Sequence, residues 1–201
     1  MTDTRQALVE GVTECIREGG VGAASSRAIA AAAGVNLGAI TYHFGSKDDL
    51  VAEALLTTIR GAFEPALSAL RRDDLEPAVR VGMAVEALRG TFRAQAADAP
   101  AYVEALVQAR HLPALREGLF ELAGELRRFL SEQIAAQQEA GQLPAWIDPA
   151  PMATLILAVL NGTVMQAVLD PEGTDVDAVA AQFAALLLAV ATGPWRPVAE
   201  G

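Results

Sequence analysis

The stretch from Ser25 to Leu50, SSRAIAAAAGVNLGAITYHFGSKDDL, constrains the fold more than any other part of the chain. It predicts two short helices, Ser26–Ala33 and Leu37–Phe44, separated at Gly34, where a helix end favours a residue that tolerates positive φ. Side-chain oxygens that can accept free backbone N–H groups precede three helix starts, at Ser25, Asn36 and Ser46. Two helices joined by a turn with glycine form a helix-turn-helix, whose second helix can lie in a DNA major groove.

These residues resemble the TetR family of bacterial transcriptional regulators. The resemblance rests on Ile29-Ala30, Ala33-Gly34-Val35, Gly38, Ile40, Tyr42-His43-Phe44, Ser46-Lys47 and Leu50. Ser25 stands where the family has Thr, Asn36 where it has Ser, and Tyr42-His43-Phe44 is one residue shorter than the commonest spacing. The resemblance implies a repressor that leaves its operator when a small ligand enters a C-terminal helical domain.

Composition favours an all-α protein of one or two domains. The chain has 201 residues, 52% of them hydrophobic, and its apolar residues recur at helical spacing. We expect about nine helices, at 4–18, 26–33, 37–44, 47–70, 77–97, 100–110, 113–140, 149–169 and 175–192. The predicted domains are a helix-turn-helix DNA-binding domain at 1–46 and a ligand-binding and dimerisation domain at 47–201. No Gly/Ser-rich linker separates them, which predicts a rigid connection through the helix at 47–70.

The charge balance argues against a generic nucleic-acid coat protein. The net charge is −10, and residues 1–50 carry four basic side chains against six acidic ones. Any DNA binding must therefore come from local placement and from helix N-termini, whose N–H groups can hold phosphate.

The N-terminal segment and the single cysteine bear on the compartment. Thr2–Glu18 is polar and amphipathic rather than a signal peptide, which predicts a cytoplasmic protein. Cys15 allows no disulfide within the chain, and its place on an apolar helix face favours a buried structural thiol over a redox sensor.

The candidate DNA contacts lie in and beside the two motif helices. They are Ser25, Ser26, Arg27, Asn36, Leu37, Gly38, Ala39, Thr41, Tyr42, His43 and Lys47. Small side chains at Gly38 and Ala39 would let the second helix sit deep in the groove, and Tyr42 can reach a phosphate or a thymine methyl. For several of these residues a structural role is open as well: a helix cap, a solvated surface charge, or packing between helices.

No catalytic or metal-binding set is evident. The only histidines are His43 and His111, and neither has ligand-spaced partners close in the sequence. There is no phosphate-binding loop or dinucleotide fingerprint. We therefore expect neither an enzyme nor a cofactor.

Two C-terminal segments are almost free of charge. Pro149–Leu169 has none, and Val176–Trp195 has only Asp177. A membrane hairpin is one interpretation, but the polar residues within these segments and their acidic flanks argue against it. The better interpretation is a homodimer, in which helices 149–169 and 175–192 form a four-helix bundle with the same pair of a second subunit. The resemblance implies the same.

The effector pocket is predicted from residues of the C-terminal helices with few charges among them. The candidates are Met83, Phe92, Tyr102, His111, Phe120, Trp146, Asn161 and Met165. They favour an apolar or aromatic effector with one or two polar anchors, although most such residues are ordinary core.

The sequence thus predicts a dimeric, ligand-responsive repressor that binds palindromic operator DNA. Two alternatives stay open. One is a helical small-molecule-binding protein that has kept the motif without using it. The other is an activator or a regulator that needs a co-repressor.

Overall fold

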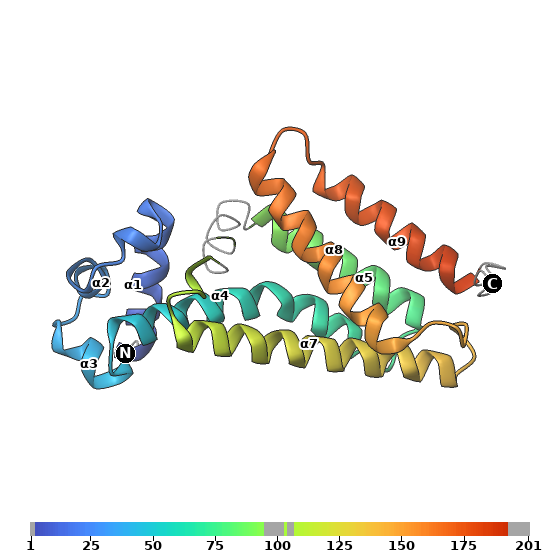
Figure 1. Ribbon diagram of the computed structural model, residues 1–201, viewed down its shortest axis with the longest axis horizontal. Coiled ribbons are helices and arrows are strands. Elements are labelled where there is room, and N and C mark those ends of the chain that lie inside the picture. Colours follow the sequence, from blue (N-terminus) through green and yellow to red (C-terminus); the bar gives the residue numbers. More distant parts are fainter. Residues whose placement is uncertain (1–2, 95–102, 104–106, 193–201) are drawn as a thin grey trace. The chain divides into compact units, whose positions relative to one another are not determined.

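The computed structural model describes residues 3–94, 103 and 107–192, and the regular elements of these residues are all helices (Figure 1). They are α1 (Thr4–Gly19), the 3-10 helix η1 (Val21–Ala23), α2 (Ser26–Ala32), α3 (Gly38–Phe44), α4 (Lys47–Leu70), α5 (Pro77–Ala94), α7 (Pro113–Glu139), α8 (Pro149–Leu169) and α9 (Val176–Thr192). The all-α prediction is confirmed. The helix expected at about 100–110, and residues 95–97 of the one before it, lie mostly outside the described residues.

The described residues belong to two compact units. The first unit comprises the described parts of Met1–Glu64 and Thr91–Leu122, and the second comprises those of Pro65–Gly90 and Ala123–Gly201. Helices α4 and α7 therefore contribute residues to both units. The division into domains at residue 46 stays a prediction.

The core of the first unit begins where α1 packs against α2. Leu8, Val12 and Ile29 are fully buried. Gly11 makes this close approach possible, because a Cβ there would lie 3.0 Å from the Ile29 carbonyl oxygen and 3.1 Å from the Ala33 nitrogen. The cysteine predicted to be structural, Cys15, is buried on α1, and burial raises the pKa of its thiol.

The first part of α7 packs against the first part of α4. Leu50 on α4 and Leu115 on α7 are fully buried. Gly118 lies so close to the Leu56 side chain that a Cβ there would collide with it. The segment of α4 that directly follows the helix-turn-helix is thus covered by α7 within the same unit.

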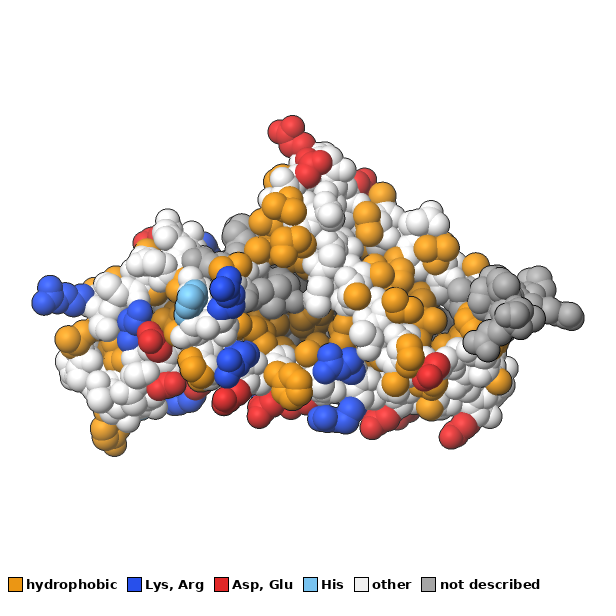
Figure 2. All heavy atoms as spheres, viewed as in Figure 1, with side chains coloured by type: hydrophobic (Ala, Val, Ile, Leu, Met, Phe, Trp, Pro, Cys, Tyr) orange, Lys and Arg blue, Asp and Glu red, His pale blue; other side chains and the backbone are white. Residues whose placement is uncertain are grey.

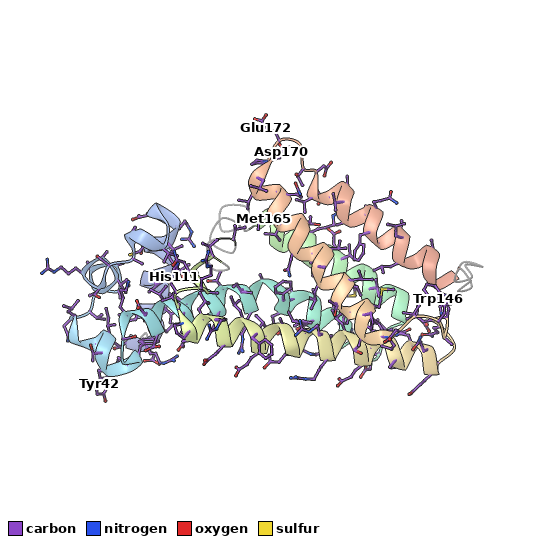
Figure 3. All side chains as sticks on the ribbon, viewed as in Figure 1. Tyr42, His111, Trp146, Met165, Asp170 and Glu172 are labelled. Carbon is purple, nitrogen blue, oxygen red and sulfur yellow. The ribbon has the colours of Figure 1, made fainter. Side chains whose placement is uncertain are left out.

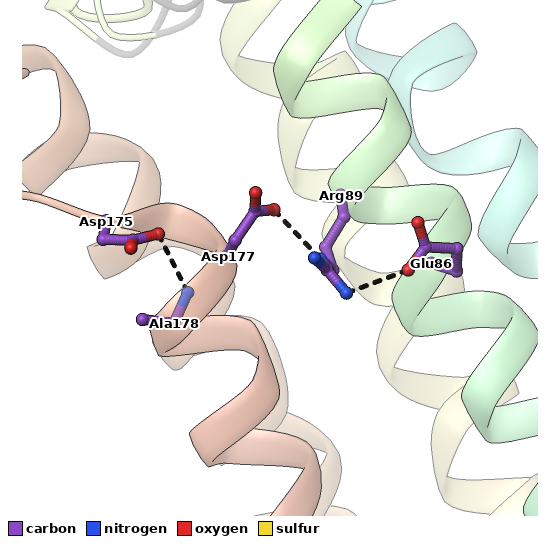
Figure 4. A network of polar contacts seen from close by, with 5 residues as sticks. All are labelled: Glu86, Arg89, Asp175, Asp177 and Ala178. Carbon is purple, nitrogen blue, oxygen red and sulfur yellow. Dashed lines mark hydrogen bonds and ion pairs between the residues drawn. The ribbon is translucent and has the colours of Figure 1, made fainter.

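In the second unit α5 packs against the end of α4 and is linked to α9. Ala66, Ala69 and Ala84 form a buried cluster of small side chains. Arg89 on α5 donates from Nε to Asp177 on α9 at 2.9 Å and pairs with Glu86 at 3.0 Å (Figure 4). Hydrogen bonding to Asp177 raises the pKa of the Arg89 guanidinium.

Helices α8 and α9 are apolar yet largely uncovered. By length and composition α8 could cross a membrane, because an 18-residue stretch of it has a mean hydropathy of 1.8. Only 17% of this stretch is buried, so most of the apolar helix is not covered by other described residues. Apolar side chains lie along both helices (Figure 2). The large exposed ones are Leu155, Leu169, Val179 and Leu186. A second layer of protein would suit this surface, because exposed apolar patches of this kind usually mark interaction sites.

Valine at position 11 should destabilise the first unit. Its side chain would push α2 away, and such overpacking costs about 1–3 kcal/mol. The matched control is Gly61→Ala in α4, where a Cβ meets no neighbouring atom. That change should stabilise the helix by about 0.5–1 kcal/mol, because alanine is the better helix former. Urea unfolding measures both, and a Gly11→Val variant as stable as the wild type would contradict the close α1–α2 packing.

Candidate nucleic-acid interface

Ser25, Asn36 and Ser46 each accept a backbone N–H at a helix start, as predicted. Helix α3 itself begins at Gly38, one residue later than predicted, so its N-cap position is Leu37 and Asn36 lies just before that residue. The Ser25 hydroxyl accepts a hydrogen bond from the Ala28 N–H at 3.2 Å, and the Asn36 side-chain amide oxygen, Oδ1, accepts one from the Ala39 N–H at 3.0 Å. Ser46 accepts from the Asp49 N–H at 3.0 Å and donates its hydroxyl proton to the Asp49 carboxylate at 2.6 Å. These bonds satisfy backbone donors that a helix start leaves free, so they define where α2, α3 and α4 begin.

Glycines end the two helices that precede a cap. Gly34 follows α2 with φ +65°, and Gly45 follows α3 with φ +80°. A side chain is strained in this left-handed region, which is why glycine suits both turns. The chain therefore makes two tight reversals between α2 and α4, and α3 lies between them.

One face of α3 packs inward and the other is exposed to solvent. Ile40 is the only residue of α3 in the buried class. Tyr42 is 84% exposed and points away from the other helices (Figure 3), and Leu37 just before the helix is 51% exposed. The Tyr42 and His43 rings are nearly perpendicular, with 4.9 Å between their centroids. The exposed face combines apolar and polar side chains around a small residue, Gly38, which suits insertion into a groove.

The other candidate DNA contacts differ in exposure. Exposed members of the set are Ser25, Arg27, Asn36, Gly38 and Thr41, and partly buried members are Ser26, Ala39, His43 and Lys47. All lie on the segment from the start of α2 to the start of α4. Their contact with DNA stays a prediction.

Lys47 and Arg5, two of the cations of the first unit, lie close to acidic side chains. Lys47 Nζ lies 3.4 Å from the Asp48 carboxylate. Arg5 on α1 pairs with Glu53 on α4, and its guanidinium lies 4.7 Å from the centre of the Phe44 ring at the end of α3. Sequence reasoning missed the Arg5 contacts, because residues 5, 44 and 53 share no local spacing that would reveal them.

The described effector candidates come from both units. Phe92, His111 and Phe120 belong to the first unit and Met83, Trp146, Asn161 and Met165 to the second. Tyr102 lies outside the described residues, and the side chain of Phe92 is not described. Phe120 is 75% exposed and Met83 42% exposed, while Trp146 and Met165 are partly buried (Figure 3). Their role in effector binding stays a prediction.

An open cavity of about 410 Å³ lies between the end of α8 and the start of α9. Its lining comprises Val159, Gly162, Thr163, Gln166, Gly173, Thr174, Asp175 and Val179. None of the eight predicted effector contacts is among them, although Asn161 and Met165 lie on the same helix.

Two family models match the chain. Residues 8–54 match the bacterial regulatory proteins of the tetR family, and residues 77–192 match the C-terminal domain of BetI-type transcriptional repressors. The second match alone covers more than half of the chain. The chain belongs to the TetR family. It is therefore a ligand-responsive transcriptional regulator rather than an enzyme, and the family implies operator DNA and a small effector as its partners.

Solved structures share the fold. A TetR-family transcriptional regulator from Rhodococcus sp. is 19% identical, with a TM-score of 0.76 over 96% of this chain and 100% of that one. A transcriptional regulator from Saccharomonospora viridis in complex with choline is 22% identical, with a TM-score of 0.71 over 94% and 96%. FadR from Bacillus subtilis in complex with stearoyl-CoA is 17% identical, with a TM-score of 0.74 over 92% and 97%. No curated protein matches the chain significantly.

Substitutions at Asn36 should separate capping from DNA contact. Asn36→Ala removes the side-chain acceptor of the Ala39 N–H and leaves only the Asn36 backbone carbonyl at 3.1 Å, so it should cost about 0.5–1 kcal/mol of stability. Asn36→Asp keeps a good cap, so stability should stay within about 0.5 kcal/mol, but its charge should repel phosphate and weaken operator binding.

The matched control is Gln142→Glu, the same amide-to-carboxylate change in an exposed part of the second unit. Urea unfolding and fluorescence anisotropy with operator DNA give the two readouts. Full operator affinity in Asn36→Asp would mean that residue 36 does not face DNA.

Proposed function

We propose that this TetR-family protein is a cytoplasmic repressor that binds palindromic operator DNA as a homodimer and leaves it when a small apolar or aromatic effector binds the C-terminal domain. The observation that carries the proposal is the exposed face of α3, with Tyr42 84% exposed and the small Gly38 at its start. In a regulator of this family, such a face is the surface available for base edges and phosphates.

DNA contact is proposed to come from side chains on either side of α3. Arg27 and Lys47 supply the charges, while Thr41 and Tyr42 supply a hydroxyl and an apolar ring. The start of α4 adds backbone N–H groups and the positive end of a helix dipole, although Asp48 and Asp49 in its first turn offset part of this field. DNA binding would therefore depend on the exact placement of a few groups, rather than on the net charge of the unit.

The proposed dimer uses the apolar surface of α8 and α9. Ala153 and Val164 face inward on α8, whereas Leu155 and Leu169 are exposed, so the helix is apolar on both sides. A helix of this type is usually buried on both sides. Pairing α8 and α9 with the same helices of a second subunit would cover this surface. A two-fold axis would then place the two α3 helices about 34–36 Å apart, one DNA turn.

Release is proposed to act through α4, which contributes Lys47–Glu64 to the first unit and Pro65–Leu70 to the second. Pro65 lies inside the helix at this boundary and has no N–H to donate to the Gly61 carbonyl. Prolines are common sites of helix bending. An effector that binds one α4 orientation more tightly than the other would change the spacing of the α3 helices and lower operator affinity by that difference.

The effector class rests on this chain's own predicted pocket residues. The choline and stearoyl-CoA named with the two solved structures differ widely, so they do not identify the ligand here. Because the predicted contacts are mostly apolar and aromatic, apolar or aromatic compounds should raise the melting temperature of the protein. A thermal-shift screen in which only polyanionic compounds do so would contradict the proposed class.

Two alternatives to an effector-released repressor differ from it in function. The acidic excess of residues 1–50 favours a helical ligand-binding protein with a vestigial DNA-binding motif. An activator, or a repressor that needs its ligand, would differ only in the sign of the effector's action on DNA binding.

Loss of the Tyr42 side chain should weaken operator binding without unfolding the protein. The residue is almost fully exposed, so Tyr42→Ala removes a contact with DNA and little internal packing. We expect a loss of about tenfold in operator affinity, equivalent to about 1.4 kcal/mol. Fluorescence anisotropy with DNA from beside the protein's own gene and with a random-sequence pool gives the affinities.

The matched control is Val79→Ala on α5, another exposed apolar residue. If Tyr42→Ala binds operator as well as the wild type does, the role assigned to α3 is wrong. If the wild type binds neither the DNA from beside its own gene nor the random-sequence pool, the vestigial-motif alternative replaces the proposal.

A charge on the exposed face of α8 should break the proposed dimer. Leu155→Glu would place a carboxylate in an apolar interface, where an unpaired charge is costly. We expect a monomer in sedimentation velocity and a large loss of operator affinity. Val107→Glu, at a residue of similar exposure in the first unit, is the control and should stay dimeric. A Leu155→Glu dimer of unchanged stability would exclude this face as the interface.

A further inference from the structure

We propose that Arg5 is a positioning residue for DNA recognition: its guanidinium, shared between Glu53 and the Phe44 ring, holds the C-terminal end of α3 against α1 and α4. The inference rests on the proposed role of α3 in reading DNA. It concerns a residue outside the helix-turn-helix stretch.

Helix α3 has few buried residues of its own to hold it in place. It has seven residues, of which only Ile40 is in the buried class. Helices this short are marginal in water unless tertiary contacts hold them. Ile40 holds the middle of α3, and the end near Phe44 needs a second contact.

Arg5 contacts α3 at its C-terminal end, at Phe44. The Arg5 guanidinium carbon lies 4.7 Å from the centre of the Phe44 ring, within the distance at which a cation and an aromatic face attract. The same guanidinium donates to the Glu53 carboxylate on α4. One side chain on α1 thereby contacts the last residue of α3 and the first half of α4.

The other contacts of Arg5 limit its availability to DNA. Its backbone N–H bonds the Asp3 carboxylate at 3.1 Å, which sets the start of α1 and so the origin of the side chain. Because Glu53 offsets its charge, Arg5 is less suited to hold a DNA phosphate than an unpaired arginine would be. The contacts therefore favour an indirect role, in which Arg5 orients the face that carries Tyr42.

The test separates orientation from phosphate contact by salt dependence. Operator and random-sequence affinities are measured by anisotropy over a range of salt for the wild type, Arg5→Gln, Arg5→Lys, Glu53→Gln and the double variant. A positioning role predicts that Arg5→Gln lowers the ratio of operator to random-DNA affinity by roughly tenfold. The slope of log K against log salt should stay unchanged, because no phosphate contact is lost.

Glu53→Gln gives the sharper result, because the two roles predict opposite signs. If Arg5 positions α3, losing its partner should lower the affinity ratio, and the double variant should lose no more than Arg5→Gln alone. If Arg5 binds phosphate, releasing it from Glu53 should raise operator affinity, and Arg5→Gln should reduce the slope by about 0.9 per contact. Either of these last results would overturn the proposal. Arg5→Lys keeps the charge but not the guanidinium, so it should fall between wild type and Arg5→Gln.

Matched controls change the same charges elsewhere on α1. Arg17→Gln and Glu14→Gln alter the net charge as Arg5→Gln and Glu53→Gln do, and both residues are exposed. They should leave the ratio of operator to random-DNA affinity unchanged. An equal loss of the ratio in the controls would assign the effect to net charge and contradict the proposal.

A readout without DNA keeps this inference distinct from the proposed function. The Gly45 N–H bonds the Thr41 carbonyl at 3.0 Å and closes the last turn of α3. In Arg5→Gln its hydrogen exchange should become several-fold faster, whereas the Val35 N–H, bonded to the Ala30 carbonyl at 3.0 Å, should be unaffected. Unchanged exchange at Gly45 would overturn the positioning role. A wild type that binds no DNA, with faster Gly45 exchange in the variant, would overturn only the proposed function.

Discussion

The burial of Ile40 is the interaction on which the rest of the proposed DNA-binding surface depends. Helix α3 is too short to be stable alone, so it stays helical only while Ile40 packs into the first unit. The Asn36 cap fixes where it begins, and Gly45 lets the chain turn into α4. With the inner face held in this way, the opposite face, with Tyr42, is free to meet another molecule. Changes to the buried core of this unit should therefore affect DNA recognition even far from the exposed face.

The acidic character of the chain then limits how DNA can be bound. With a net charge of −10, the protein as a whole repels phosphate. A few groups near α3 must supply the attraction to phosphate. Acidic partners offset part of the positive charge even there, as Asp48 does for Lys47 and Glu53 for Arg5. In this account binding gains more from the orientation of α3 than from long-range electrostatic attraction, and specificity exceeds what the charge alone would suggest.

Local patterns predicted most of the fold, because caps, glycines and apolar spacing act within a few residues. Thus α4 and α8 begin and end where the sequence indicated, at Lys47–Leu70 and Pro149–Leu169. Contacts between segments far apart in the chain were not predictable. Neither the Arg5–Glu53 pair nor the Gly118–Leu56 packing follows from any spacing, since each depends on how helices meet. The effector candidates were chosen by composition alone, which cannot tell a pocket wall from a core or from an exposed residue such as Phe120.

The salt dependence of operator binding by the wild-type protein shows how many cations meet DNA phosphates. If Arg27 and Lys47 are the cations of each subunit that meet phosphate, a dimer makes four such contacts. The slope of log K against log salt should then be about −3.6. A slope near this value, with clear preference for operator over random DNA, would support recognition by a few placed groups on an acidic unit. A slope steeper than about −8 would mean that many more cations contact DNA than this account allows. Equal binding to both DNAs would contradict sequence recognition by α3.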